Sequence, residues 1–277
     1  MGASRSILLS LLAGLLYLSP YAFIQAQGLD QPNQRDFSFP VAQALDALDA
    51  EDDPLVQGHW LAAQLRKLAL GIPGDITAWL NVRHADGQRQ QHALIKQTKP
   101  LNQGWRDVFV LQDELGVSVE SLSIDHLPGQ VPTYRHLRGD LSALDQDAPA
   151  VLEGAQIMVP FGGSGFWLVD LGLDFLHWPQ QQVIPHRIQM RKGVSCQVLE
   201  SQLNVAQDQG YQRVRSWVSR EHGGIVYAEA YNSEGRKIKV FEVNDVRKVN
   251  DQWYVTELKI RDLVNRSTST MVFDPEP

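Results

Sequence analysis

The stretch that decides the fold runs Gly162-Gly163-Ser164-Gly165-Phe166-Trp167-Leu168-Val169-Asp170-Leu171-Gly172-Leu173-Asp174-Phe175-Leu176-His177-Trp178-Pro179. Its first glycines free the backbone for a tight turn, and the aromatic and aliphatic side chains that follow require burial. As a helix, the stretch is apolar on nearly every side. The exceptions are Asp170, Asp174 and His177, which are spaced so that they fall on one helical face. This polar face indicates either a site or the solvated edge of the helix.

Strand-like segments lie on both sides of this stretch. Alternating apolar and polar residues predict strands over residues 76–137 before it and 184–273 after it, joined by turns such as Ala85-Asp86-Gly87-Gln88. Short turns join antiparallel neighbours, so we expect an antiparallel meander of about eleven strands rather than a parallel sheet. Residues 41–71 have helical periodicity instead.

A meander of this kind must bury one of its faces. A closed barrel, a sandwich, or a strongly curved sheet wrapped around helices would each do so. The apolar segments 41–71 and 166–178 favour the third architecture. We therefore predict a mainly β, α+β fold: one half-barrel domain over residues 41–277, with helices, including a helical cover over residues 162–179, on the concave face.

The N-terminus has the pattern of a secretory signal peptide over residues 1–26. Arg5 precedes an apolar run, and Ile24-Gln25-Ala26 ends on a small residue suited to cleavage. The run is shorter than the roughly 20 residues that span a bilayer, so an uncleaved anchor is the less favoured alternative. No lipidation cysteine follows the run. We expect a flexible leader over residues 27–40 and a protein exported to the periplasm.

Charge and cysteine content exclude several classes of function. The chain of 277 residues has a net charge of −7, and without residues 1–26, which hold Arg5 and no acid, 24 basic residues face 32 acidic ones, a net charge of −8. This balance argues against nucleic acid and anionic membrane surfaces as partners. The single cysteine, Cys196, excludes an internal disulfide and a cysteine metal cluster, and we expect a buried strand thiol.

Two catalytic interpretations of the central stretch are weak. Ser164 lies among glycines, but a nucleophile elbow needs glycine where Phe166 stands and a strand of a parallel sheet before it. Asp170, Asp174 and His177 would bind a divalent metal or act as an acid/base group if one helical face brought them within about 6 Å of one another. The edge of an otherwise apolar helix explains the same three residues better. We therefore predict no catalytic residues, no metal and no cofactor.

Aromatic residues are the remaining signal. They are spread over both sets of strands and the central stretch, and they would either line an apolar ligand cavity or fill a core. Core filling is the better interpretation of any single one, but helices over a curved sheet can open an apolar interior when they shift. The candidate ligand-binding residues are Trp79, Trp105, Phe109, Phe166, Trp167, Phe175, Trp178, Trp217 and Trp253.

From Gly165 to Asp274 the chain resembles the LolA-like outer-membrane lipoprotein-sorting proteins. The resemblance rests on the order of several segments: Gly165-Phe166-Trp167-x-x-Asp170-Leu171, Phe175-Leu176-x-Trp178-Pro179, Cys196-x-Val198-Leu199-Glu200, Tyr227-Ala228-Glu229-Ala230-Tyr231-x-x-x-Gly235-Arg236 and Phe241-x-Val243-x-Asp245-x-x-Lys248-Val249-Asn250-x-Gln252-Trp253. The first half of the chain matches only as a helix followed by strands.

The resemblance implies a half-barrel whose apolar concave face, closed by helices, holds the acyl chains of a lipoprotein during transit across the periplasm. The implied partners are lipid acyl chains or lipidated proteins and envelope transport proteins, and we expect a monomer. Two alternatives stay open: a metal-assisted hydrolase using Asp170, Asp174 and His177, and an envelope scaffold that binds partners along its sheet edge. A contiguous cavity on the order of several hundred Å3 favours a carrier, whereas a solidly packed interior leaves only the likeness of fold.

Overall fold

The computed structural model describes residues 53–68, 75–139, 149–184, 188–206, 209–249 and 252–274. All of them belong to one compact unit, Phe37–Pro277. The expected signal peptide, the leader and the expected helical residues 41–52 and 69–71 lie outside the described residues. Within the described ranges, no helix combines the length and the apolar character that crossing a membrane requires.

The first half of the sheet is a meander in which each strand pairs antiparallel with the one before it. Along β1, every second side chain is buried, because successive residues of a strand point to opposite faces. The strands are β1 (Asp75–Arg83), β2 (Arg89–Pro100), β3 (Trp105–Gln112), β4 (Ser118–His126), β5 (Thr133–Arg138) and the short β6 (Val151–Leu152).

The second half continues the antiparallel pairing after the central stretch. A tight turn at Lys192 and Gly193, both with positive φ, joins β8 to β9. The strands are β7 (Gln180–Val183), β8 (Gln189–Arg191), β9 (Val194–Gln202), β10 (Arg213–Ser219), β11 (Ile225–Tyr231), β12 (Lys237–Val249), β13 (Gln252–Asp262) and β14 (Ser267–Asp274).

Pairing of β1 with β14 joins the two halves into one sheet of 14 strands, in the order β6-β5-β4-β3-β2-β1-β14-β13-β12-β11-β10-β9-β7. The sheet is open, with β6 and β7 at its edges and β8 paired to β9 beside β7. The predicted antiparallel, mainly β fold is confirmed. The second set of strands begins before the expected residue 184, because β7 begins directly after Pro179, and residues 185–187 lie outside the described residues.

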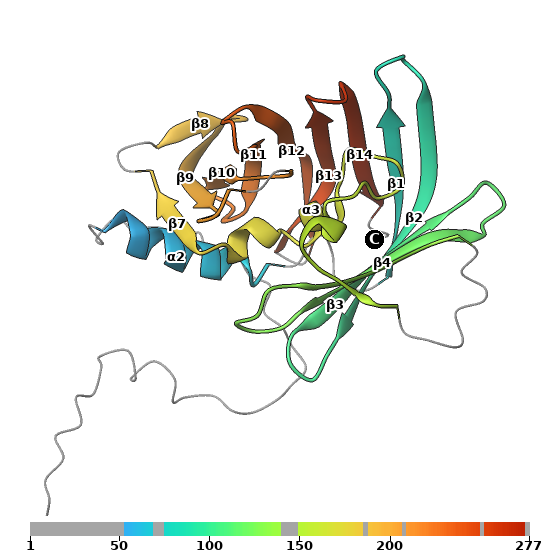
Figure 1. Cartoon of the computed structure of the whole chain (residues 1–277), viewed down its shortest axis with the longest axis horizontal. Coiled ribbons are helices and arrows are strands. Elements are labelled where there is room, and N and C mark those ends of the chain that lie inside the picture. The colour runs from blue at the N-terminus through green and yellow to red at the C-terminus, as the bar shows by residue number, and fades with distance from the viewer. Residues whose placement is uncertain are drawn as a thin grey trace, which may run out of the picture. The chain divides into compact units, whose positions relative to one another are not determined.

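Helix α2 (Pro54–Leu65) lies against the β7 edge of the sheet (Figure 1). It begins where Asp53 accepts a hydrogen bond from Leu55 N at 2.9 Å, with Pro54 in the first turn. A Cβ added to Gly58 would lie 2.4 Å from the backbone of Gln181. Glycine at this position therefore lets the helix rest directly on β7.

We call residues 154–178 the plug. It contains a 3-10 turn η3 (Gly154–Ile157), the four-residue helix α3 (Leu168–Leu171) and a second 3-10 turn η4 (Asp174–His177). The single helix expected over residues 166–178 is wrong, because Leu173 takes a left-handed conformation with φ 52° and separates α3 from η4.

The plug fills the inner side of the sheet's curve, where Figure 1 shows it running between the two halves of the sheet. Its apolar side chains form one core with the inward residues of the strands and of α2. Seven of these side chains are 3% exposed or less: Phe161, Phe166, Leu168, Val169, Leu171, Phe175 and Leu176.

A second, smaller cluster occupies the opposite face of β9 and β10. Cys196, Val198 and Trp217 form it, while the neighbouring Val218 belongs to the main core. Strand β8 covers this cluster, with the Arg191 guanidinium 4.7 Å from the centre of the Trp217 ring. The expected buried strand thiol is thus observed, and burial raises the pKa of Cys196 to about 11.

Candidate functional site

The plug and the sheet face beneath it bring together five of the nine aromatic residues that the sequence singles out. Phe109, Phe166, Phe175 and Trp178 are buried in the main core, and Trp167 packs against it. Phe109 comes from β3, whereas the other four belong to the plug. These five residues are the apolar centre of the candidate site.

The other four aromatic residues lie elsewhere. Trp79 is 46% exposed and points away from the core, and Trp217 belongs to the second cluster. Trp105 stacks on His126 at 4.8 Å and donates its indole N–H to Asp107. The side chain of Trp253 lies outside the described part of the structure.

The apolar interior is filled by the plug's own side chains. Two surface pockets lie apart from it: one of about 290 Å3 between α2 and β7, which includes Leu55 and His59, and one of about 210 Å3 beside β11, β12 and β13, which includes Val226 and Tyr254. An interior packed in this way leaves only the likeness of fold in favour of a carrier, and a ligand on the apolar sheet face would have to take the place of plug side chains.

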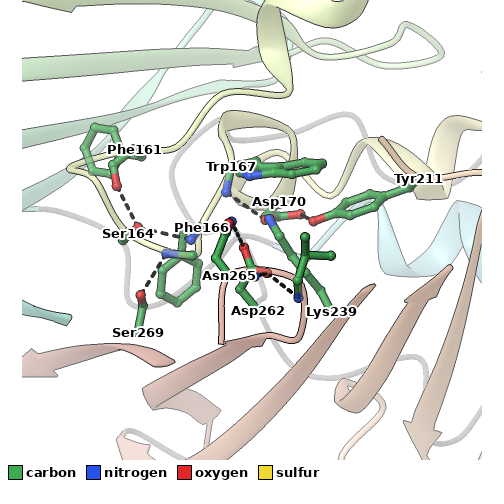
Figure 2. Close-up of polar contacts among 12 residues, drawn as sticks. Phe161, Ser164, Phe166, Trp167, Asp170, Tyr211, Lys239, Asp262, Asn265 and Ser269 are labelled. Carbon is green, nitrogen blue, oxygen red and sulfur yellow. Dashed lines mark hydrogen bonds and ion pairs between the residues drawn. The ribbon is translucent and has the colours of Figure 1, made fainter. Parts of the chain in front are cut away.

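A buried ion pair ties the middle of the plug to the sheet (Figure 2). Lys239 on β12 places its Nζ 3.1 Å from Oδ2 of Asp170, and both side chains are 2% exposed or less. The Asp170 carboxylate also accepts hydrogen bonds from Tyr211 Oη at 2.7 Å and from Trp167 N at 2.8 Å. Both carboxylate oxygens of Asp170 are thereby bonded to groups of the protein itself.

Aromatic rings enclose the same ammonium group. Trp167 and Tyr211 stack with their ring centres 5.0 Å apart, and Lys239 Nζ lies 3.6 Å from the centre of the Trp167 ring. Burial lowers the pKa of Lys239 to about 8 and raises the pKa of Asp170, because both charged forms lose hydration. The Lys239–Asp170 pair therefore combines favourable ionic and cation–π contacts with a large desolvation cost.

The turn at residues 161–166, within the plug, is held by hydrogen bonds between side chains and the backbone (Figure 2). Ser164 donates its hydroxyl to Phe161 O at 2.6 Å and accepts from Phe166 N at 3.0 Å. Gly165 N donates to Ser269 Oγ of β14 at 2.8 Å, and Gly162 N donates to Glu120 of β4 at 3.1 Å. Ser164 thus closes a turn, and its position is that of a structural residue rather than a nucleophile.

The metal hypothesis does not fit the geometry. Asp170 is paired with Lys239, Asp174 accepts from the indole N–H of Trp178 at 3.1 Å, and His177 lies on η4. Because Leu173 breaks the helix, these residues do not share one helical face. Among the described residues, no group of three or more histidine, cysteine, aspartate or glutamate side chains is arranged to hold a metal ion.

Sequence reasoning missed the sheet residues that hold the plug. Lys239 lies between Ile238 and Val240 on β12, and Tyr211 precedes β10. A lysine flanked by two buried aliphatic residues in a strand is the available signal, but strand periodicity also permits it to face solvent. Its partner Asp170 is 69 positions away, so only the folded chain shows the pair.

Comparisons with known proteins place this geometry in a known fold. A family model described as "Uncharacterized protein" matches residues 149–275. No curated protein sequence matches the chain significantly. Three solved structures are similar: a DUF1329 family protein from Desulfovibrio piger (TM-score 0.66, 15% identity), a putative outer membrane lipoprotein-sorting protein domain from Vibrio parahaemolyticus (0.64, 15%) and a LolA superfamily protein from Nitrosomonas europaea (0.54, 12%).

The matches cover 80%, 80% and 79% of this chain, respectively, and 92% of each of the three solved chains. They extend through both halves of the sheet, whereas the sequence resemblance is confined mainly to residues 165–274. The chain therefore has the LolA-like fold that the resemblance predicts.

Proposed function

We propose that the protein is an exported carrier that binds the acyl chain of a lipid or of a lipidated protein between its plug and its sheet. The observation that carries this proposal is that the apolar inner face of the sheet is covered by a segment of the protein's own chain, largely through apolar side chains. An acyl chain can replace those side chains, since each buried methylene contributes about 0.8 kcal/mol.

The attachment of the plug suits reversible displacement. Its polar contacts with the strands gather at a few points, such as Gly162 to Glu120, Gly165 to Ser269 and Asp170 to Lys239. Between these points, contact is mainly apolar packing, which has no directional requirement. A carrier must shield a long chain from water and yet release it, and a cover that exchanges places with the cargo meets both needs.

The N-terminal sequence and the fold support a place in the cell envelope. The signal-peptide pattern of residues 1–26 is the proposed export signal. A protein with this fold, from Vibrio parahaemolyticus, is described as a putative outer membrane lipoprotein-sorting protein domain. We extend that role to this chain as part of the proposal, with lipidated proteins and envelope transport proteins as its partners.

A disulfide that locks the plug to the sheet tests the proposal. A Cβ added to Gly165 would lie 3.7 Å from Cβ of Asp262, within the span of roughly 3.5–4.5 Å that a disulfide bridges. The variant is Gly165→Cys with Asp262→Cys, made together with Cys196→Ala so that no other thiol is present. The two single-cysteine variants are the controls, because Asp262 also accepts from Val264 N and Asn265 N.

Binding of a fluorescent acyl probe is measured with the disulfide formed and after reduction. We expect the oxidised variant to bind at least about tenfold more weakly than its reduced form, and the single-cysteine variants to show no redox dependence. Equal binding by the oxidised and reduced forms would show that the plug need not move. If the wild-type protein binds no acyl probe, the carrier function itself is wrong.

A further inference from the structure

A small pocket lies where the end of α2, the plug and strands β3 and β4 meet. Its volume of about 10 Å3 is close to the space of a single water molecule. Leucine side chains form its walls, among them Leu65 of α2 and Leu171 and Leu176 of the plug, which also belong to the main core. The pocket is thus at the rim of the apolar interior.

Three nitrogen-bearing side chains from three different segments line this pocket: Arg66, His126 and His177. Arg66 Nε donates to Ala62 O of its own helix at 3.3 Å, and no carboxylate of the described residues pairs with its guanidinium. His126 Nε2 is buried without a hydrogen-bond partner in the described part of the chain. Donors and the positive charge of Arg66 therefore converge here, and Asp107 is the one carboxylate among the lining residues.

The nearby carboxylates have other partners. Asp107 also lines the pocket and lies 3.4 Å from His126 Nε2, but Lys96 Nζ, itself buried, lies 3.2 Å from its other oxygen. Thr98 and Trp105 donate to Asp107 as well. Asp174, on the turn that carries His177, accepts from Trp178. With Asp107 offset by Lys96, the Arg66 charge makes the pocket positive.

We propose that this pocket receives the anionic headgroup, a carboxylate or a phosphate, of an amphiphile whose acyl chain occupies the space under the plug. The proposal rests on the proposed carrier function and names its class of cargo. Guanidinium and imidazole N–H groups are strong donors to oxyanions. The adjoining Leu171 and Leu176 lead directly from the pocket into the core that an acyl chain would enter.

The present size of the pocket links headgroup binding to plug movement. A carboxylate or phosphate needs more room than one water, so it enters when η4 and the end of α2 separate. Burial, together with the charges of Arg66 and His126, lowers the pKa of His177 to about 4. At neutral pH the imidazole is therefore uncharged and offers a single N–H, and Arg66 supplies the charge.

Direct binding of radiolabelled palmitate and hexadecanol to the full protein tests the inference, because the two have equal chain length and differ in headgroup charge. We expect palmitate to bind about tenfold more tightly than hexadecanol. Arg66→Gln should remove most of this preference, because Arg66 supplies the charge, whereas His177→Gln keeps an N–H donor and should change the preference little. Lys67→Gln is the matched control, since Lys67 is the next residue, is exposed and bonds to Gln64, and it should keep the preference.

Each other outcome overturns one claim. Equal affinity for palmitate and hexadecanol would reject the anion pocket while leaving the carrier function standing. Binding of neither would reject the carrier function. Inorganic phosphate that displaces palmitate at similar concentration would show a site for free anions rather than for a lipid headgroup. Unfolding curves of Arg66→Gln and His177→Gln confirm that each variant is folded before its binding is compared.

Discussion

Lys239 Nζ lies 3.1 Å from Asp170 Oδ2 and joins the centre of the sheet to the centre of the plug. The pair is buried from water and enclosed by the rings of Trp167 and Tyr211. Displacing the plug would separate two charges that have no other neutralising partner at this distance in the described structure. The pair therefore opposes release of the plug. The apolar contacts around it are not directional, so the sheet face can pack against the plug or against another apolar surface.

Replacing one partner of this pair should strongly destabilise the fold. Lys239→Met leaves the Asp170 carboxylate buried without its cation, and we expect a loss of about 3–5 kcal/mol in the free energy of unfolding, measured by urea denaturation. Lys239→Met combined with Asp170→Asn should lose clearly less than the sum of the two single changes, because no buried charge is left. Additive losses would mean that the pair is not coupled.

The control for this cycle is Lys237→Met on the same strand. Lys237 pairs with Glu229 at 2.8 Å, but its side chain is 39% exposed, so water screens the interaction. We expect a change below about 1 kcal/mol. A loss as large as that of Lys239→Met would show that any lysine on β12 is needed for folding, regardless of the plug.

The hydroxyl of Tyr134 offers a second test of plug packing. It is buried without a hydrogen-bond partner among the described residues, and a Cβ added to Gly172 would lie 2.0 Å from it. We expect Tyr134→Phe to raise the free energy of unfolding by about 1 kcal/mol, because an unsatisfied polar group leaves the core. Gly172→Ala should lower the free energy of unfolding by about 1–3 kcal/mol. The loss should be smaller in the Tyr134→Phe background, because the hydroxyl that the added methyl group meets is absent.

Urea denaturation of the two single variants and the double variant measures this cycle. A loss of stability in Tyr134→Phe would contradict the prediction and indicate a water bridge from the hydroxyl, for which the unpaired Oδ1 of Asp174 is the candidate acceptor.

The sequence predicts the sheet well because strand signals are local. Alternation in segments such as Ile76 to Val82 and turns such as Ala85 to Gln88 act within a few residues, and both appear in the structure. The plug was harder to predict because its backbone depends on tertiary contacts. The periodicity of residues 166–178 predicts one continuous helix despite Gly172. No local signal indicates that Leu173 adopts a positive φ and ends the helix there.

The polar contacts of the site depend on long-range pairing and were not predictable from one segment. The sequence marks Asp170 as polar in an apolar stretch, but its partners are Lys239 on β12 and Tyr211, which precedes β10. The same holds for Arg66 and His126, which only the folded chain brings to His177. A single sequence shows which residues are polar in an apolar context, not what they face.

Helix α2 should be displaced by a single methyl group at Gly58. An added Cβ would lie 2.4 Å from the backbone of Gln181. That backbone cannot readily shift, because Gln181 belongs to β7, which is paired with β9. We expect Gly58→Ala to cost about 1–3 kcal/mol in the free energy of unfolding despite the better helix propensity of alanine. Val56→Ala, at a residue 48% exposed on the same helix, is the control and should change it by less than about 0.5 kcal/mol. An equal effect of both changes would argue against close packing of α2 on β7.

Acid should loosen the plug through His177. Its pKa in the folded protein is lowered from 6.5 to about 4, so between these values the unfolded chain binds more protons than the folded one. The contribution of His177 to stability is therefore complete above pH 6.5 and is lost as pH falls toward 4. Protonation would place a positive charge in a buried position, where it loses hydration, and beside Arg66 and His126, and these are the physical reasons for the loss.

Thermal unfolding at about pH 7 and about pH 5 measures this effect as the fall in midpoint temperature. We expect His177→Gln to show a smaller fall than the wild-type protein, because glutamine does not titrate. His92→Gln on β2, away from the pocket, should reproduce the wild-type fall. A His177→Gln variant that is as acid-sensitive as wild type would assign the acid response to other groups and remove His177 as a point where pH acts on the plug.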